Sequence, residues 1–201
     1  MTLKILILFG ATGDLARNKI LPALERVKNL KVIAYSRKEF DTKYDYIQGN
    51  LDDLSKLREH INRQKDIHVY CYIALPPDAY FQVVKSIFQY LGDLYPKIAL
   101  EKPFGNSLDE AQDLEKTIKK YGESNFYLVD HYLAKDGVRN QTKKANLQSV
   151  HIALLETIDV ESRKEFYDKT GAIRDVGQSH LINVLAKFLG DKPTKFLDNL
   201  H

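Results

Sequence analysis

Apolar residues in the first two thirds of the chain form short, β-branched runs separated by stretches with helical spacing. The runs are expected to be strands at residues 5–9, 32–35, 44–47, 67–74, 98–100 and 126–129. Between them, apolar residues recur at three- and four-residue intervals, the spacing of one helix face, as at Leu54, Leu57 and Ile61. Alternating helices and almost wholly apolar strands predict a parallel sheet covered on both faces.

This alternation stops after residue 129. The pattern there predicts a polar helix from residue 130 to about 144, one strongly apolar strand at 149–156, a charged loop and a helix at about 173–188. We therefore expect two domains, residues 1–129 and residues 130–201, the second a small α+β unit.

Composition excludes several classes of protein. The 201 residues include 30 basic and 27 acidic ones, and the net charge of +3 is too scattered to form the basic stripe that nucleic-acid binding needs. Cys71 is the only cysteine, so we expect no internal disulfide, no zinc or other metal site, and a reducing compartment. The apolar run at residues 3–9 is too short to cross a bilayer. These features favour a cytoplasmic protein that does not associate with membranes.

The first predicted strand runs directly into a glycine turn and a helix, "FGATGDLAR". Gly10 and Gly13 would let the backbone approach a pyrophosphate, and the helix that follows offers N–H groups to the anion. The spacing is G-x-x-G-x-x-A rather than the full G-x-G-x-x-G, so the strand-to-helix context carries the interpretation. It predicts a Rossmann-type, doubly wound sheet in residues 1–129, a dinucleotide-binding domain.

The end of the second predicted strand indicates which dinucleotide. An acidic residue there would hold the ribose 2′-hydroxyl of NAD, but this chain has Ser36 and Arg37. A hydroxyl and a guanidinium suit a 2′-phosphate. NADP is therefore favoured, and NAD stays open.

Four further residues are candidates for the active site, although each could instead have a purely structural role. Lys102 ends the fifth strand before a proline, at the edge where parallel sheets bind ligands. Tyr80 follows "LPPDA" and could face the nicotinamide or belong to the core. Asp130 could cap a helix on which His131 and Lys135 share one face. His180, on the last helix, needs a partner to be more than a packed histidine.

In this order, the segments "GATGDLARNKILPAL", "EKPFG", "DHYLAK" and "IRDVGQSH" resemble the glucose-6-phosphate dehydrogenase family. The resemblance implies that His180 is the general base and that Asp130 orients it. It implies substrate contacts from residues in both predicted domains: Lys19, Lys102, His131, Tyr132, Lys135, Glu156 and Asp175. It also implies NADP contacts from Gly10, Ala11, Thr12, Gly13, Asp14, Leu15, Ala16, Arg17, Ser36, Arg37, Tyr80 and Lys102.

The implied reaction fits these residue types. Oxidising the C1 hydroxyl of glucose 6-phosphate to 6-phosphogluconolactone removes a proton and a hydride from one carbon unit, so a base must touch the hydroxyl while nicotinamide C4 faces the carbon. Histidine titrates near neutrality, and a carboxylate can fix its tautomer.

The chain departs from the family in length and in two positions. It ends soon after His180, without the large antiparallel sheet that relatives carry, and we expect a compact natural form rather than a cut fragment. Leu128 and Leu155 stand where the resemblance implies basic residues, so another phosphosugar or free glucose stays open as substrate. The apolar strand at 149–156 would lack a partner in its own domain, which predicts a homodimer joined through it.

Three other functions share part of this sequence pattern. A different sugar oxidoreductase of the Rossmann plan, such as a glucose-fructose or inositol dehydrogenase relative, would lack the "DHYLAK" segment with Glu156 and Asp175. A short-chain reductase would need Tyr-x-x-x-Lys, and no tyrosine here has lysine four residues on. A non-catalytic NADPH-binding module, or the nucleotide-binding half of a two-chain enzyme, would not require Asp130, His180 and Lys102 together.

Overall fold

The structure is a computed structural model that describes residues 2–62, 66–140, 149–153, 155, 168, 171 and 173–190. The chain divides into two compact units, Met1–Val129 and Asp130–His201. Each unit is described by itself.

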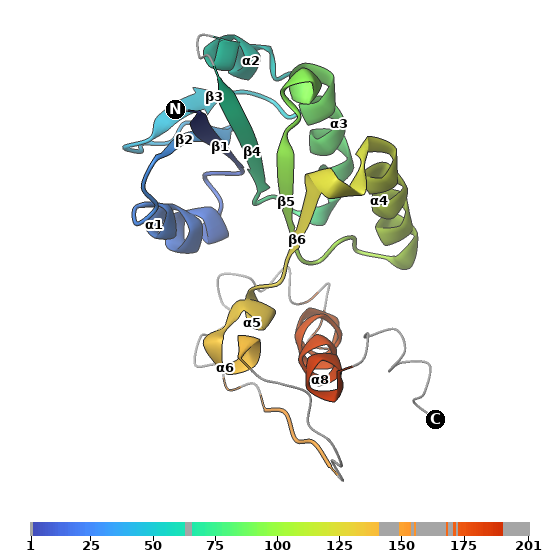
Figure 1. The fold of residues 1–201 in the computed structure, drawn as a ribbon. Helices are drawn as coiled ribbons and strands as arrows, with labels where there is room; N and C mark the ends of the chain where they lie inside the picture. Colours follow the sequence, from blue (N-terminus) through green and yellow to red (C-terminus); the bar gives the residue numbers. More distant parts are fainter. Residues whose placement is uncertain are drawn as a thin grey trace. The chain divides into compact units, whose positions relative to one another are not determined.

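The first unit is built on one six-stranded parallel sheet with the strand order β3-β2-β1-β4-β5-β6 (Figure 1). This is the Rossmann order. The chain adds β2 and β3 on one side of β1, then crosses back and adds β4, β5 and β6 on the other side. The fold class and the six predicted strands are confirmed, with ends shifted by a residue or two. The strands are β1 Leu3–Phe9, β2 Leu30–Ser36, β3 Asp45–Gln48, β4 Ile67–Ile73, β5 Lys97–Glu101 and β6 Phe126–Val129.

Helical segments connect the strands. A π-helical turn η1 (Ala16–Ile20) continues into α1 (Leu21–Leu24) after β1, and α2 (Ser55–Asn62) follows β3. After β4 come η2 (Pro77–Ala79), α3 (Tyr80–Leu91) and η3 (Gly92–Leu94). Between β5 and β6 lie α4 (Leu108–Tyr121) and η4 (Glu123–Asn125).

Side chains alternate between the two faces of the sheet, as the pleat requires. Ile5, Ile7 and Phe9 of β1 join the larger apolar core, which includes buried residues of α2, α3 and α4. Leu8 of β1 points to the opposite face and packs with Leu21 of α1 in a smaller core. Figure 1 shows α1 on one side of the sheet and α3 and α4 on the other. Each fully buried Ile or Leu contributes about 1.5–3 kcal/mol through its removal from water.

Tyr35, at the end of β2, fixes the loop after β3. Its ring is buried, and its hydroxyl donates to the carbonyl oxygens of Asn50 (2.7 Å) and Asp53 (3.1 Å). Burial raises its pKa to about 12, so the phenol stays protonated and keeps donating. Gly49 lies so close that a Cβ atom there would collide with this hydroxyl.

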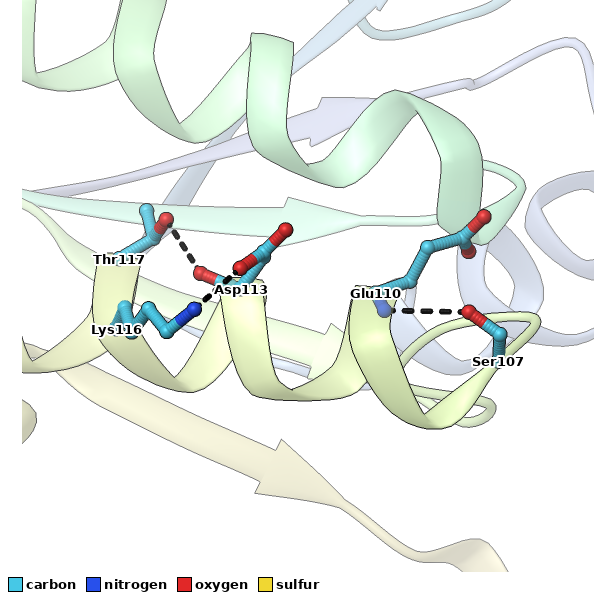
Figure 2. Close-up of polar contacts among 5 residues, drawn as sticks. All are labelled: Ser107, Glu110, Asp113, Lys116 and Thr117. Carbon is cyan, nitrogen blue, oxygen red and sulfur yellow. Dashed lines mark hydrogen bonds and ion pairs between the residues drawn. The ribbon is translucent and has the colours of Figure 1, made fainter.

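Ser107 caps the start of α4 (Figure 2). The Ser107 hydroxyl accepts a hydrogen bond from the backbone N–H of Glu110 at 3.2 Å. One turn further on, Lys116 pairs with the Asp113 carboxylate at 2.8 Å, and the Thr117 hydroxyl donates to the Asp113 carbonyl oxygen at 2.8 Å. The bond from the Glu110 N–H to Ser107 satisfies one of the backbone donors that a helix start leaves open.

In the second unit, the described residues form two short helices and one long helical segment. These are α5 (His131–Ala134) and α6 (Asp136–Arg139), then a π-helical stretch η6 (Ile173–Leu181) that continues into α8 (Ile182–Leu189). The predicted helix at about 173–188 is therefore confirmed.

Two predictions for this unit are wrong. The predicted helix from residue 130 breaks at Lys135, whose backbone is extended (φ −61°, ψ 135°), and the chain becomes helical again in α6. The predicted strand at 149–156 is not a strand at the residues described there, 149–153 and 155. A strand needs a neighbouring strand for its backbone hydrogen bonds, and the described part of this unit contains none.

Within the described part of the chain, no helix has the length and apolar character that crossing a bilayer requires.

Candidate active site

The glycine turn after β1 is shaped by close backbone contacts. Gly10 has φ +77°, and a Cβ atom there would collide with the carbonyl oxygen of Ala74. Its N–H donates to the Tyr35 carbonyl at 3.0 Å, and the Gly13 N–H donates back to the Gly10 carbonyl at 2.9 Å. Only glycine fits position 10 without strain. The turn lies at the carboxyl end of β1, beside the switch in strand order, where it fits a pyrophosphate.

The other residues of this turn that are predicted to bind the cofactor differ in solvent exposure. Ala11 and Ala16 are fully buried, so their side chains serve packing and only their backbone could meet a ligand. Thr12 is half-buried, and Asp14 and Leu15 are exposed.

Arg17 lies over an aromatic ring that sequence reasoning missed. Its guanidinium carbon is 4.8 Å from the centroid of the Phe40 ring, a cation–π distance. A shallow hollow of about 340 Å³ opens beside it between η1, α1 and the loop after β2, lined among others by Arg17, Asp41 and Tyr44. Phe40 belongs to no recognisable sequence motif. The loop between β2 and β3 brings it to Arg17, and the sequence gives no signal of this contact.

At the end of β2, Ser36 is held within its own loop. Ser36 is buried, and its hydroxyl donates to the Lys38 carbonyl at 2.7 Å. Its oxygen can still accept a hydrogen bond, and the contact of Ser36 with NADP stays a prediction. Arg37 is exposed, and its carbonyl accepts a bond from Gln48 at 2.9 Å. A guanidinium at this edge suits a phosphate.

At the end of β5, Glu101 and Lys102 stand together. Glu101 is buried, and its carboxylate accepts a hydrogen bond from the Tyr72 hydroxyl of β4. The Tyr80 hydroxyl donates to the Glu101 carbonyl at 2.7 Å. Lys102 follows, half-buried, and its peptide bond to Pro103 is cis.

Tyr80 lies in the core, one of the two places expected for it from the sequence. The side chain is only 2% exposed, and its hydroxyl is bound to the backbone, so the structure supports the core alternative over a contact with nicotinamide. Burial is the main cause that raises the pKa of both Tyr72 and Tyr80, so both phenols remain hydrogen-bond donors. Lys19, predicted to lie near the substrate, is exposed on η1.

In the second unit, the Asp130 carboxylate lies close to two residues of the last helical segment, His180 and Asn183. One carboxylate oxygen, Oδ1, caps α5 by accepting from the N–H groups of Tyr132 (3.0 Å) and Leu133 (3.3 Å). The same oxygen is 4.0 Å from Nδ1 of His180. Asn183 Nδ2 lies 3.4 Å from the other oxygen, Oδ2. Asp130 therefore caps α5 and also lies at ion-pair distance from His180.

The aromatic rings around His180 form a compact cluster. His180 is 8% exposed, and its ring centroid lies 4.0 Å from that of Tyr132 and 5.0 Å from that of His131. Lys135 Nζ lies 3.8 Å from the centroid of the Tyr132 ring. The structure thus brings together Asp130, His131, Tyr132, Lys135 and His180, although the helical face that predicted the closeness of His131 and Lys135 is interrupted.

Two predicted substrate residues stay without a described side chain. Glu156 lies outside the described residues, and Asp175 lies on η6, where only its backbone is described. Asn183 is a neighbour that sequence reasoning missed; its spacing of three residues from His180 along a helix was the available signal. No cluster of three potential metal ligands occurs among the residues that the structure describes.

Comparisons with known proteins show the family of the chain. Residues 27–140 match the family model of the NAD binding domain of glucose-6-phosphate dehydrogenase, and residues 138–199 match that of its C-terminal domain. Glucose-6-phosphate 1-dehydrogenase of Saccharomyces cerevisiae is 28% identical, with 96% of this chain and 50% of the relative covered. The enzyme of Helicobacter pylori is 31% identical, with 96% of this chain and 56% of the relative covered.

A solved structure described as glucose-6-phosphate dehydrogenase in complex with its substrate glucose-6-phosphate is also similar. It has a TM-score of 0.78 and 26% identity, and the match covers 93% of this chain and 51% of that one. The chain thus spans about half the length of the relatives it matches. Because the model of the nucleotide-binding domain alone matches more than half of the residues, the chain belongs to the glucose-6-phosphate dehydrogenase family.

Proposed function

We propose that the protein oxidises glucose 6-phosphate at C1 to 6-phosphogluconolactone with NADP as the hydride acceptor. The observation that carries the proposal is the pairing of His180 with Asp130 inside a cluster that also holds a lysine and a second histidine. Family membership supports the reaction type, and the substrate named for the similar solved structure supports the sugar.

His180 is the general base in this proposal. Its Nδ1 faces Asp130, which leaves Nε2 as the nitrogen that accepts the proton of the C1 hydroxyl. The carboxylate favours the tautomer with hydrogen on Nδ1 and stabilises the imidazolium that forms. The site is well shielded, since His180 and Asp130 side chains are 10% and 11% exposed, and low solvent access strengthens this electrostatic effect.

Three residues near this pair hold the phosphate of the substrate in this proposal. His131 and Lys135 are exposed, so both present donors to solvent and to a ligand, whereas Tyr132 is buried and offers mainly its hydroxyl. The Lys135 ammonium makes a cation–π contact with the Tyr132 ring. Lys19, Lys102, Glu156 and Asp175 contact the sugar by resemblance to the family.

The first unit, residues 1–129, binds the nucleotide in this proposal, and the second, residues 130–201, binds the sugar. Bound NADP supplies the nicotinamide carbon that takes the hydride from C1. The glycine turn receives the pyrophosphate through backbone N–H groups, and Arg37 pairs with the 2′-phosphate. Arg37 has no neighbouring acidic residue in the "YSRK" segment to favour NAD. NAD use at lower efficiency is compatible with these contacts.

A homodimer is part of the proposal, although the described residues of segment 149–156 form no edge strand that could join two copies. Val150 and Leu155 are 40% and 91% exposed, and exposed apolar side chains favour a partner surface. Light scattering at micromolar concentration measures the mass directly, and a monomer would contradict the dimer. The expectation of a cytoplasmic protein stays a prediction.

Initial rates of NADPH formation test the proposed function. Glucose 6-phosphate and glucose are each offered with NADP and with NAD, and we expect the highest kcat/KM for glucose 6-phosphate with NADP. A higher kcat/KM for unphosphorylated glucose would contradict the phosphate contacts. No turnover with any of the four pairs would contradict the activity of this chain alone, and activity restored by a second polypeptide would favour the two-chain alternative.

A further inference from the structure

The peptide unit in front of Lys102 is held at two points. The Tyr80 hydroxyl, from the first turn of α3, donates to the Glu101 carbonyl oxygen at 2.7 Å, and this bond is buried. The Tyr72 hydroxyl, from β4, donates to the Glu101 carboxylate. Because the Glu101 carbonyl shares a rigid peptide plane with the Lys102 nitrogen, a bond to that carbonyl fixes the direction in which the chain leaves β5.

The carboxylate bond stabilises the same residue from the opposite side. Glu101 is 9% exposed, and a buried carboxylate is costly unless it is hydrogen-bonded. Tyr72 supplies that bond while its ring packs against the smaller apolar core. Tyr80 is fully packed in the larger core, which contacts the opposite face of the sheet. Glu101 is thus anchored to both cores.

We propose that Tyr72 and Tyr80 are positioning residues that aim Lys102 through Glu101. Neither phenol touches the substrate in this proposal; each acts through the residue before the lysine. In this proposal Tyr80 anchors the backbone, in place of the NADP contact that the resemblance implies. The role rests on the proposed function, because it assumes that Lys102 contacts the sugar and the cofactor.

Lysine labelling tests the positioning without any need for activity. Tyr72→Phe and Tyr80→Phe each remove one hydroxyl and keep the ring. An amine-reactive reagent is applied to the folded full chain, and mass spectrometry gives the labelling rate of Lys102 relative to Lys97. Lys97 lies at the other end of β5 and is held by Ser124 and Asn125 at 3.0 Å each, so it reports general loosening.

We expect the ratio of Lys102 to Lys97 labelling to rise at least about threefold in both variants, since a half-buried lysine on a loosened turn is more often open to reagent. Tyr70→Phe is the matched control, because Tyr70 lies two residues before Tyr72 on the same face of β4 and pairs in register with Lys97 rather than Ala99. An unchanged ratio in the folded tyrosine variants, or an equal rise in Tyr70→Phe, would overturn the proposal.

Two substitutions at Glu101 keep the test decisive if a tyrosine variant does not fold. Glu101→Gln retains an oxygen that accepts the Tyr72 bond and should leave the ratio unchanged, whereas Glu101→Leu removes the acceptor and should raise it. The opposite order would overturn the role of Tyr72.

Kinetics then separate this inference from the proposed function. If the wild-type chain oxidises glucose 6-phosphate, kcat of Tyr72→Phe and Tyr80→Phe should fall about 10- to 100-fold, because small displacements of a catalytic group are costly, while the Kd for NADP changes little. If the wild-type chain is inactive, the proposed function fails, and the labelling ratio still decides whether the two phenols position Lys102.

Discussion

His180 Nδ1 lies 4.0 Å from Asp130 Oδ1, although the two residues belong to helices far apart in the sequence. Oδ1 also caps α5, so the helix start fixes where the carboxylate points. A distance of 4.0 Å is an ion-pair distance and longer than a hydrogen bond, and such contacts in active sites shorten when a ligand binds. The structure thus places a carboxylate at ion-pair distance from the imidazole that we propose as the base.

Replacing Asp130 by Asn tests this relationship. Asn is also a good helix cap, so the free energy of unfolding should change by less than about 1 kcal/mol. The neutral amide cannot stabilise an imidazolium, and kcat should fall at least about 100-fold. Steady-state kinetics and chemical denaturation measure the two effects. Asp136→Asn, an exposed position on α6, is the control and should keep kcat; a similar loss there would mean that the effect is not specific to Asp130.

Arg37→Gln tests the choice of nucleotide. Loss of a guanidinium that pairs with the 2′-phosphate should weaken NADP binding about 10-fold or more and leave NAD binding unchanged, because NAD lacks that phosphate. Equilibrium titration of both nucleotides measures the ratio. Arg26→Gln removes the same charge from an exposed position after α1 and should alter neither Kd. An equal loss of NAD affinity in Arg37→Gln would contradict the assignment.

Gly49→Ala should destabilise the first unit. The added methyl group would collide with the Tyr35 hydroxyl, which cannot move without losing its bonds to Asn50 and Asp53. Such overpacking costs about 1–3 kcal/mol in the free energy of unfolding. Gly137→Ala, where a Cβ atom would meet nothing within 4 Å, should be neutral or slightly stabilising. Denaturant unfolding distinguishes them, and equal stability of the two variants would contradict the packing described.

Cys71 should report unfolding of the sheet. It is fully buried in β4, and burial raises the pKa of its thiol well above the ordinary value, so the reactive thiolate is scarce at neutral pH. Alkylation of the native protein should therefore be slow and should accelerate only when denaturant unfolds the sheet. A labelling rate in buffer equal to that of the unfolded chain would show that the thiol is accessible in the folded state.

Much of the first unit could be predicted because local pattern and tertiary structure agree there. The runs that became β1 and β4 are apolar at nearly every position, which suits strands buried on both faces. Gly10 was identified from its place between a strand and a helix, and its backbone conformation and close contact with Ala74 account for the glycine.

The sequence does not display which partner each hydrogen-bonding or apolar side chain meets in the fold. Ser36 has a hydroxyl suited to a phosphate, but the loop supplies the Lys38 carbonyl first. Tyr80 follows a proline turn as a cofactor contact might, yet its ring packs into the core. The apolar run at 149–156 has strand propensity, but propensity alone supplies no neighbouring strand. Asn183 was missed because its partner Asp130 is distant in sequence.

The most direct test of the account is the turnover of His180→Asn. Because the imidazole of His180 accepts the C1 proton in the proposed mechanism, kcat with glucose 6-phosphate and NADP should fall at least about 100-fold. The Kd for NADP, measured by titration on the same preparation, should stay near the wild-type value. Turnover close to that of the wild type, with the variant folded and binding NADP, would contradict the role of His180 as the base.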